Sequence, residues 1–352
     1  MKTTLMNLFV LIIFMLGALS TQAQSNPDYH EWWHESHPGE PLNATNQKKL
    51  PLVKVEKNKF VNEQGKTLFI KGVSISDPDK IANQGHWNKK YFEVIKDWGI
   101  EMVRIPVHPV AWRERTPIGY MQLLDQAVNW CTELGIYVII DWHSIGNLKT
   151  ELFQNPMYHT SFSETCMFWR TMAIRYGGHN TVAFYELFNE PTTYRKQLGT
   201  ISWSTWKAMM EEVIDIIRAF DKETIPLVAG FDWAYDLTPL RLEPIAREGI
   251  GYVTHPYGHK RTQPWEPKWE EAFGFAAWEY PVVATEIGFV LGDSGLKDNE
   301  DYGKRIIDYL NANGISWLWW VFDPEWHPNM IESWDTFKPT EFGQFCKDTY
   351  KK

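Results

Sequence analysis

Residues 184–191 read FYELFNEP and residues 282–288 read VVATEIG, so two short apolar runs each lead into a glutamate, Glu190 and Glu286. An ionised carboxylate is costly to bury unless it is paired, and a buried strand has no ordinary use for one at its end. Both runs lie in a chain that alternates strand-like and helix-like segments. The two segments therefore predict acidic side chains at the carboxyl ends of two parallel strands.

The alternation extends over most of the chain. The segments with the short apolar pattern of buried strands are 69–74, 102–107, 137–141, 182–188, 226–230, 251–255, 282–285 and 316–321. The helical patterns cover 89–98, 120–134, 162–176, 202–220, 267–278, 300–311 and 340–350, with a weaker one at 236–247 that Pro239 and Pro244 interrupt. This order predicts an α/β fold, a closed (β/α)8 TIM barrel. The first strand-to-helix turn lacks the Gly-rich pattern of a dinucleotide site.

The amino-terminal part divides into three pieces. Residues 1–23 have the basic start, the apolar stretch and the small-residue cleavage site of a secretory signal, and the apolar stretch is too short to span a bilayer. Residues 24–50 are polar, without periodicity, and are expected to form an extended arm. Residues 51–352 form the expected catalytic barrel, with a short antiparallel hairpin built from 53–55, 59–61 and 67–70 at its base. We expect a secreted or periplasmic protein that is free of the membrane after signal cleavage.

Composition narrows the class of partner. A net charge of -9 and an acidic excess argue against a nucleic-acid surface. Three cysteines, Cys131, Cys166 and Cys346, cannot all pair with one another, and buried free thiols are expected. The 19 tryptophans suit a sugar-binding cleft, because the CH faces of sugar rings stack on flat aromatic side chains. The tryptophans that flank strand ends could line such a cleft or belong to the core: Trp112, Trp142, Trp233, Trp265 and Trp326. The oligomeric state stays open.

The carboxyl ends of the strands form the active face of such a barrel. Besides the two glutamates, the polar or aromatic residues that close or interrupt the apolar runs are Arg104, His143, Asn189, His255, Tyr257 and Trp320. One strand-end acid would be weak evidence, because it could be structural. Two acids that converge on one cleft are the minimal equipment for cleaving a glycosidic bond.

Seven stretches, in this order, resemble glycoside hydrolase family 5, the cellulase-like retaining hydrolases: FIKGV (69–73), VRIPV (103–107), DWH (141–143), LFNEP (187–191), HPY (255–257), ATEIG (284–288) and WLWWVFD (317–323). The resemblance implies that Glu190 is the acid/base and Glu286 the nucleophile. It implies that the other six residues named above complete the active site. No cofactor or metal is expected, because two carboxylates suffice for the chemistry. The resemblance also implies a polysaccharide or oligosaccharide substrate, with an endo-acting β-1,4-glucanase first and a β-mannanase, an exo-acting β-glycosidase or a transglycosylase as alternatives.

The chemistry of the residues agrees with these roles. A nucleophile must stay ionised, and Arg104 and the Tyr257 hydroxyl could stabilise Glu286 in that form. A proton donor needs a raised pKa, which we expect for Glu190 from apolar surroundings and a nearby negative charge. Asn189 could donate to the sugar 2-hydroxyl, and Trp320 could form the floor under the cleaved sugar, unless a shift of strand register puts another tryptophan there. His143 and His255 could relay protons or be structural.

Two alternative readings remain. A non-catalytic glycan-binding barrel would keep the aromatic cleft but is expected to lack a glutamate, and both are present. The segment 30–34, HEWWH, matches the zinc-binding pattern His-Glu-x-x-His. It lies just after the signal in an arm without helical periodicity, so we expect no zinc site there.

Overall fold

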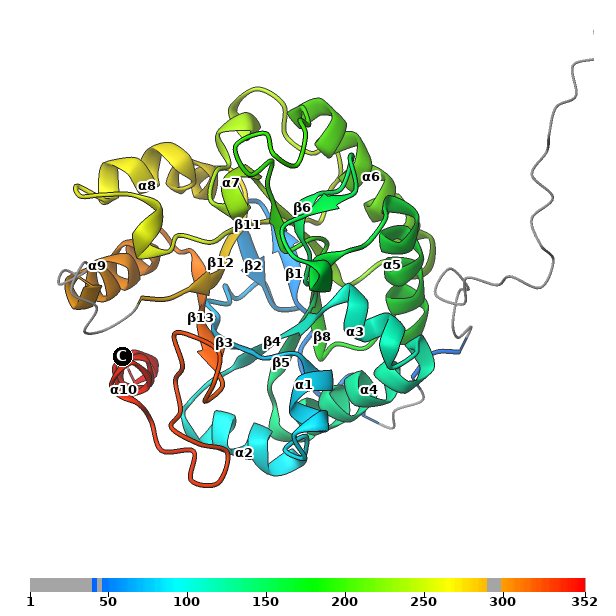
Figure 1. Ribbon diagram of the computed structural model, residues 1–352, viewed down its shortest axis with the longest axis vertical. Helices are drawn as coiled ribbons and strands as arrows, with labels where there is room; N and C mark the ends of the chain where they lie inside the picture. Colours follow the sequence, from blue (N-terminus) through cyan, green and yellow to red (C-terminus); the bar gives the residue numbers. More distant parts are fainter. Residues whose placement is uncertain (1–39, 43–45, 290–298, 352) are drawn as a thin grey trace, which may run out of the picture. The chain divides into compact units, whose positions relative to one another are not determined.

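The structure is a computed structural model that describes residues 40–42, 46–289 and 299–351. The predicted signal and the HEWWH segment lie outside these residues. Eight parallel strands close into a barrel with the helices around it (Figure 1). In chain order the barrel strands are β3 (Lys71–Ile75), β4 (Met102–Val107), β5 (Tyr137–Trp142), β8 (Val182–Glu186), β10 (Ile225–Ala229), β11 (Gly251–Thr254), β12 (Val282–Ile287) and β13 (Ser316–Phe322). The predicted (β/α)8 barrel is confirmed.

The main helices follow the predicted pattern: α2 (Lys89–Asp97), α4 (Pro117–Leu134), α5 (Phe162–Tyr176), α6 (Trp203–Phe220), α8 (Glu266–Ala272), α9 (Asn299–Ala312) and α10 (Glu341–Tyr350). Several begin after a Ser, Thr or Asn whose side chain accepts from a backbone N–H of the first turn, as Ser161 and Ser202 do. Short helices α1 (Pro78–Asn83) and α3 (Pro109–Glu114) are additional. The predicted helix at 236–247 is wrong: only the 3-10 turn Thr238–Arg241 forms there, because prolines interrupt the backbone hydrogen bonding.

A small hairpin occupies the amino-terminal end of the barrel. Strands β1 (Lys54–Glu56) and β2 (Lys59–Val61) pair antiparallel, and Thr67 adds only a single bridge to Val61. Phe60 is buried in one apolar cluster with barrel residues such as Leu227 and Leu318, and its ring lies edge-on to that of Phe184, 4.9 Å between centroids. The hairpin therefore fills the end of the barrel opposite the carboxyl ends of the strands.

The last residues of the expected arm are attached to the barrel. The backbone N–H of Leu42 donates to Arg175, that of Asn180 donates to Gln47, and the Asn180 side chain donates to Leu50. A polar segment without periodicity can thus be ordered by backbone hydrogen bonds that no side-chain pattern announces.

The cysteines are unpaired, as expected, with Cys131 and Cys346 buried but Cys166 only half-buried. No helix in the described ranges has both the length and the apolar character that a bilayer crossing requires.

Candidate active site

The barrel order places the two glutamates on nearby strands. Going round the barrel, β8 is followed by β10, β11, β12 and β13, and the last of these lies opposite β8. Glu286 belongs to β12. Glu190 lies four residues beyond the end of β8, in the two-residue strand β9 (Glu190–Pro191), which pairs with β6 (Ile145–Asn147) in a small sheet that also contains β7 (Leu152–Phe153). The predicted strand at 182–188 is thus two residues too long.

Arg104 is the central cation of the site and is fully buried. It donates to Glu286 at 2.8 Å, to both oxygens of Glu186 at 2.7 and 2.9 Å, and to the Asn189 Oδ1 at 2.6 Å. Asp141 lies 3.0 Å from the same guanidinium. Burial alone would lower the pKa of Arg104, but the three carboxylates outweigh it and raise the pKa well above its usual value, so the arginine stays charged.

Glu286 is held from two directions. Its Oε1 accepts from Arg104, and its Oε2 accepts from the Tyr257 hydroxyl at 2.7 Å. Burial, together with Glu286 itself, raises the pKa of Tyr257 well above its ordinary value, so the phenol stays a donor. Arg104 and Tyr257 thus make the contacts with Glu286 that the sequence predicted for them.

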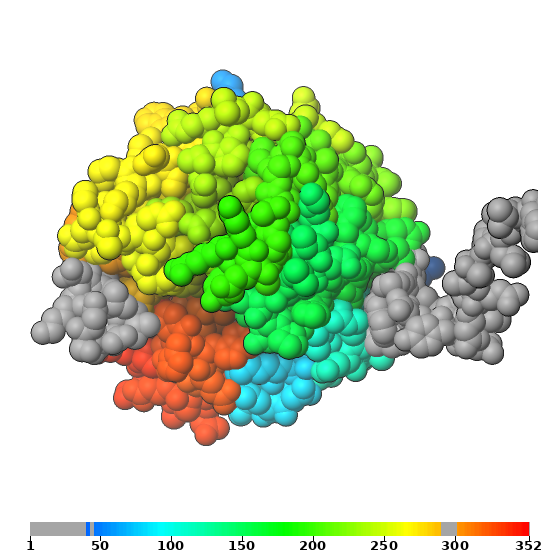
Figure 2. Space-filling model, turned by 45° about the horizontal axis from the view of Figure 1, so that its top comes forward, coloured from blue at the N-terminus to red at the C-terminus, as the bar shows by residue number. Residues whose placement is uncertain are grey.

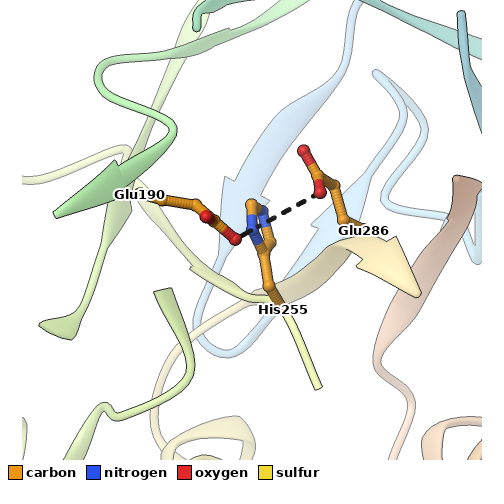
Figure 3. Close-up of side chains that lie close together, drawn as sticks. All are labelled: Glu190, His255 and Glu286. Carbon is orange, nitrogen blue, oxygen red and sulfur yellow. Dashed lines mark hydrogen bonds and ion pairs between the residues drawn. The ribbon is translucent and has the colours of Figure 1, made fainter. Parts of the chain in front are cut away.

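Glu190 has a different partner. The His255 Nδ1 lies 3.0 Å from Glu190 Oε1 and 3.9 Å from Glu286 Oε2, so the imidazole stands between the two carboxyl groups (Figure 3). The other ring nitrogen contacts the Thr285 hydroxyl, which in turn donates to Glu186. One oxygen of Glu190 and one of Glu286 lie within 4.8 Å of each other.

The electrostatics of Glu190 differ from the expectation. Burial raises its pKa, but Lys260, the hydrogen bond with His255 and Arg104 together lower it below the usual value. His255 shows the opposite balance, because burial lowers its pKa whereas Glu286, Glu186 and Glu190 raise it. The expected raised pKa for Glu190 is therefore wrong for the protein without substrate. The two pKa shifts both favour a proton on His255 over one on Glu190.

The remaining predicted residues lie in the same place. His143 is 2.6 Å from Asp141 and parallel to the ring of Trp320, with 5.5 Å between centroids. Burial, with the charges of His108 and Arg104, lowers the pKa of His143 well below its usual value, so the imidazole is neutral. Asn189 presents its oxygen to Arg104, which leaves its NH2 group free to donate elsewhere.

A cleft of about 580 Å³ opens over these groups. Its lining includes Glu190, Glu286, His143, Asn189, Tyr257 and Trp320 from the predicted set, together with Gln154, Tyr158, Arg195, Asp232, Trp233, His259, Lys260 and Arg261. The green, yellow and orange parts of the chain that supply most of these residues are all visible on the face shown in Figure 2. Trp317 and Trp319 are fully buried, so the structure puts Trp320 in the cleft and removes the alternative register.

The other tryptophans divide into two groups. Trp112, Trp142 and Trp265 belong to the core. Trp233 lines the cleft, and Trp326 stacks on Trp320 at 5.8 Å and borders a second, smaller hollow. Glu186 and Asp141 were missed by the sequence reasoning. Each is a lone acid in an apolar strand, which is the same signal that singled out Glu190 and Glu286.

Among the described residues, Glu190, His255 and Glu286 are a group whose spacing a metal ion could use, with all ligand atoms within 4.8 Å. Arg104 already pairs with Glu286, and the charge of Lys260 acts on Glu190. These two cations oppose the binding of a further positive charge between the carboxylates.

Comparison with known proteins agrees with the geometry. The family described as Cellulase (glycosyl hydrolase family 5) matches residues 61–325, which include every predicted site residue. Endoglucanase N of Pectobacterium atrosepticum is 26% identical over 285 residues, covering 79% of this chain and 59% of that protein. Endoglucanase 5 of Pectobacterium carotovorum subsp. carotovorum is 25% identical and is covered over 52% of its length, so the chain spans between about half and three fifths of these curated relatives.

Solved structures give a closer likeness. The β-glucanase SdGluc5_26A from Saccharophagus degradans is 45% identical with a TM-score of 0.86, and the match covers 92% of this chain and 99% of that one. The same β-glucanase in complex with cellotetraose matches at 44% identity and a TM-score of 0.86, with the same coverage. The chain belongs to glycosyl hydrolase family 5, the cellulase family.

Proposed function

We propose that the protein is a secreted, retaining glycoside hydrolase that cleaves β-1,4-linked glucan by double displacement, with Glu286 as nucleophile and Glu190 as acid/base. The observation that carries this proposal is the pair of carboxyl groups within 4.8 Å with unlike partners. A pair this close suits direct attack by one carboxylate and leaves no room for an intervening water, the arrangement of retaining enzymes.

In the first step, Glu286 attacks the anomeric carbon and forms an ester bond to the sugar while the glycosidic C–O bond breaks. Arg104 and Tyr257 each donate a hydrogen bond to the attacking carboxylate and fix its orientation. The leaving oxygen takes a proton from Glu190, and Glu190 draws it from His255 at 3.0 Å. The free NH2 group of Asn189 donates to the 2-hydroxyl as positive charge develops on the sugar ring.

In the second step, water attacks the same carbon and the ester bond to Glu286 breaks. Glu190 accepts the proton of the water and the pair with His255 is restored. Two displacements on one carbon return the sugar to its starting anomeric configuration. Trp320, held against His143, provides the floor under the cleaved sugar.

The substrate class is supported by the relatives. The curated proteins are named endoglucanases, and the similar solved structure is a β-glucanase bound to cellotetraose. We therefore propose an endo-acting β-1,4-glucanase that takes polysaccharide or oligosaccharide chains and acts outside the cytoplasm after cleavage of residues 1–23.

A product profile tests the proposal. The protein is incubated with defined β-1,4-glucans, mixed-linkage β-glucans, β-mannans and β-xylans, and the products are separated by length and time. A range of medium-length cello-oligosaccharides appearing early supports the proposal. One product length from the start would mean exo action, longer products than the substrate would mean transglycosylation, and faster cleavage of mannan would replace the substrate. Absence of cleavage of all four would refute the hydrolase.

A further inference from the structure

The segment Phe231–Ala234, labelled α7, has an unusual backbone. Asp232, Trp233 and Ala234 have φ values of 57°, 55° and 58°, the left-handed region that residues with a side chain rarely adopt. Three such residues in succession are costly and persist only where their surroundings enforce them. The segment follows β10, next to β8 in the barrel, on the side of the cleft that carries Glu190.

Residues 255–260 stabilise this conformation, because they donate hydrogen bonds to the carbonyl groups of all three residues. The Lys260 ammonium donates to the carbonyls of Asp232 at 3.0 Å and Trp233 at 2.7 Å. The backbone N–H of His255 donates to the carbonyl of Ala234 at 2.9 Å. The same stretch carries the imidazole that binds Glu190 and the Tyr257 hydroxyl that binds Glu286.

The result is a fixed indole in the cleft. The Lys260 ammonium lies 5.5 Å from the centre of the Trp233 ring, and the indole N–H donates to Gln154 at 2.9 Å. Tyr194 meets the ring edge-on at 5.9 Å. Trp233 remains partly exposed and lines the cleft, where a ligand can meet it.

The position of Trp233 indicates which sugar it would meet. Trp320 belongs to β13, which lies across the barrel from β8. In the proposed reaction Trp320 supports the sugar that becomes bound to Glu286, whereas the departing sugar leaves from the Glu190 side. Trp233 and Lys260 are on that side.

We propose that Lys260 is a positioning residue that builds the leaving-group subsite, by holding Trp233 as the platform for the glucosyl unit that departs. This inference rests on the proposed function and deepens it. Because Lys260 also places a positive charge near Glu190, the residue that shapes the subsite also acts on the proton donor. Subsite and proton donor are thereby adjusted by one side chain.

The test compares Lys260→Met, Lys260→Arg, Trp233→Ala and the double variant Lys260→Met/Trp233→Ala. Lys268→Met is the matched control, because Lys268 also donates to backbone carbonyls but does not line the cleft. Each protein is assayed with cellopentaose, which fills the leaving-group side, and with β-cellobiosyl fluoride, whose leaving group is too small to reach a platform. Circular dichroism and thermal unfolding verify folding.

We expect Lys260→Met and Trp233→Ala each to lower kcat/KM for cellopentaose about tenfold, the effect of losing a hydrogen bond to a charged group. The rate with the fluoride should stay near that of the wild type. The double variant should lose no more than the larger single loss, because both changes remove the same platform. Lys268→Met should leave both rates unchanged.

The pH profile distinguishes the effect of the Lys260 charge on Glu190 from the effect of Lys260 on the position of Trp233. Activity requires the Glu190–His255 pair to hold a proton, so it falls as pH rises through the pKa of that pair. A nearby cation disfavours the proton, so Lys260→Met should move the alkaline limb to higher pH. Lys260→Arg and Trp233→Ala should leave the limb in place.

Three results would overturn the inference. They are equal losses of activity on both substrates, a loss in the double variant equal to the product of the two single losses, and an alkaline limb that does not move in Lys260→Met. If Lys260→Met does not fold, Trp233→Ala alone decides, and an unchanged rate with cellopentaose overturns it. A wild type inactive on both substrates overturns the proposed function instead. The subsite is then tested by calorimetric titration with cellopentaose, and undiminished affinity in Trp233→Ala refutes it.

Discussion

The guanidinium of Arg104 donates one hydrogen bond to Glu286, at 2.8 Å from Nη1, while its Nε and Nη2 donate to the two oxygens of Glu186. The orientation of Glu286, the proposed nucleophile, is therefore set through Arg104 by a carboxylate on another strand, which takes no part in the proposed chemistry. The ammonium of a lysine at this position would be a point charge, without the planar set of N–H donors by which the guanidinium binds both carboxylates.

Replacing Arg104 by lysine keeps the charge but loses this planar set of donors. We expect kcat to fall about a hundredfold or more, because donors that orient a reacting group contribute about that factor. The free energy of unfolding should fall by about 3 kcal/mol, because one ammonium cannot make all the hydrogen bonds that these buried groups accept from the guanidinium. Steady-state kinetics and urea unfolding measure both. Arg247→Lys, which alters an exposed pair with Asp215, is the control and should change neither quantity.

The stereochemistry of the reaction is the second prediction. Carboxyl groups about 5 to 5.5 Å apart belong to retaining enzymes. Proton NMR of the first product from a β-linked substrate should show the β-anomer before mutarotation. An α-anomer as first product would exclude Glu286 as a nucleophile.

The third prediction distinguishes the two glutamates. Glu286→Ala should abolish turnover of every substrate, because no covalent intermediate forms. Glu190→Ala should still react with an activated aryl glycoside, which departs without protonation, and azide should accelerate it and give a retained glycosyl azide. Mass spectrometry and NMR identify the products. For Glu286→Ala, azide could at most give the opposite anomer, and the reverse pattern would exchange the roles.

The fourth prediction follows from the raised pKa of His255. A group of this kind stabilises the folded state below its unfolded pKa of about 6.5, and the contribution disappears as pH rises through the folded value. The difference in Tm between the wild type and His255→Gln should therefore be largest below that pH and shrink above it. A difference that stays constant from acid to alkaline pH would show that the histidine carries no additional proton in the fold.

The fifth prediction concerns metals and the amino-terminal arm. A strong chelator should leave turnover unchanged, because two carboxylates suffice for the proposed chemistry, and so should deletion of residues 24–39, which include HEWWH. Deletion through Leu50 should in addition lower Tm, since Gln47 and Leu50 bind Asn180. Activity lost on chelation and restored by zinc would revive the metal site.

The sequence predicted the barrel and the eight site residues because each lies beside an apolar strand, and that pattern is local. It could not predict the cluster around Arg104. Glu186 and Asp141 belong to strands that meet Arg104 only in the closed barrel, so their partner is invisible from either strand alone. The direction of the Glu190 pKa was missed for a similar reason, because Lys260 is 70 residues away in sequence.

The positive φ angles of Asp232, Trp233 and Ala234 could not be predicted from the sequence pattern either. Asp232 tolerates positive φ, but Trp233 and Ala234 do not favour it, and Lys260 and His255 from the next strand-end segment hold the conformation. Residues 40–42 and 46–50 are held by hydrogen bonds in which the partners are backbone groups or side chains distant in sequence, such as Asn180 and Arg175, and no local pattern predicts these bonds. Sequence patterns thus identify the strand ends, whereas tertiary contacts determine how the loops between them are shaped.

The hairpin that buries Phe60 lies at the amino-terminal end of the barrel, so substitutions there that affect stability are distant from substitutions that would affect substrate binding. Substitutions around Phe60 alter how much apolar surface the barrel keeps from water, while Trp233, Lys260 and Trp320 stand at the other end of the strands. Substitutions that repack the hairpin could therefore raise thermal stability, and substitutions in the loops at the other end could change substrate specificity. Because the two sets of positions are far apart, their effects should be nearly additive when they are combined.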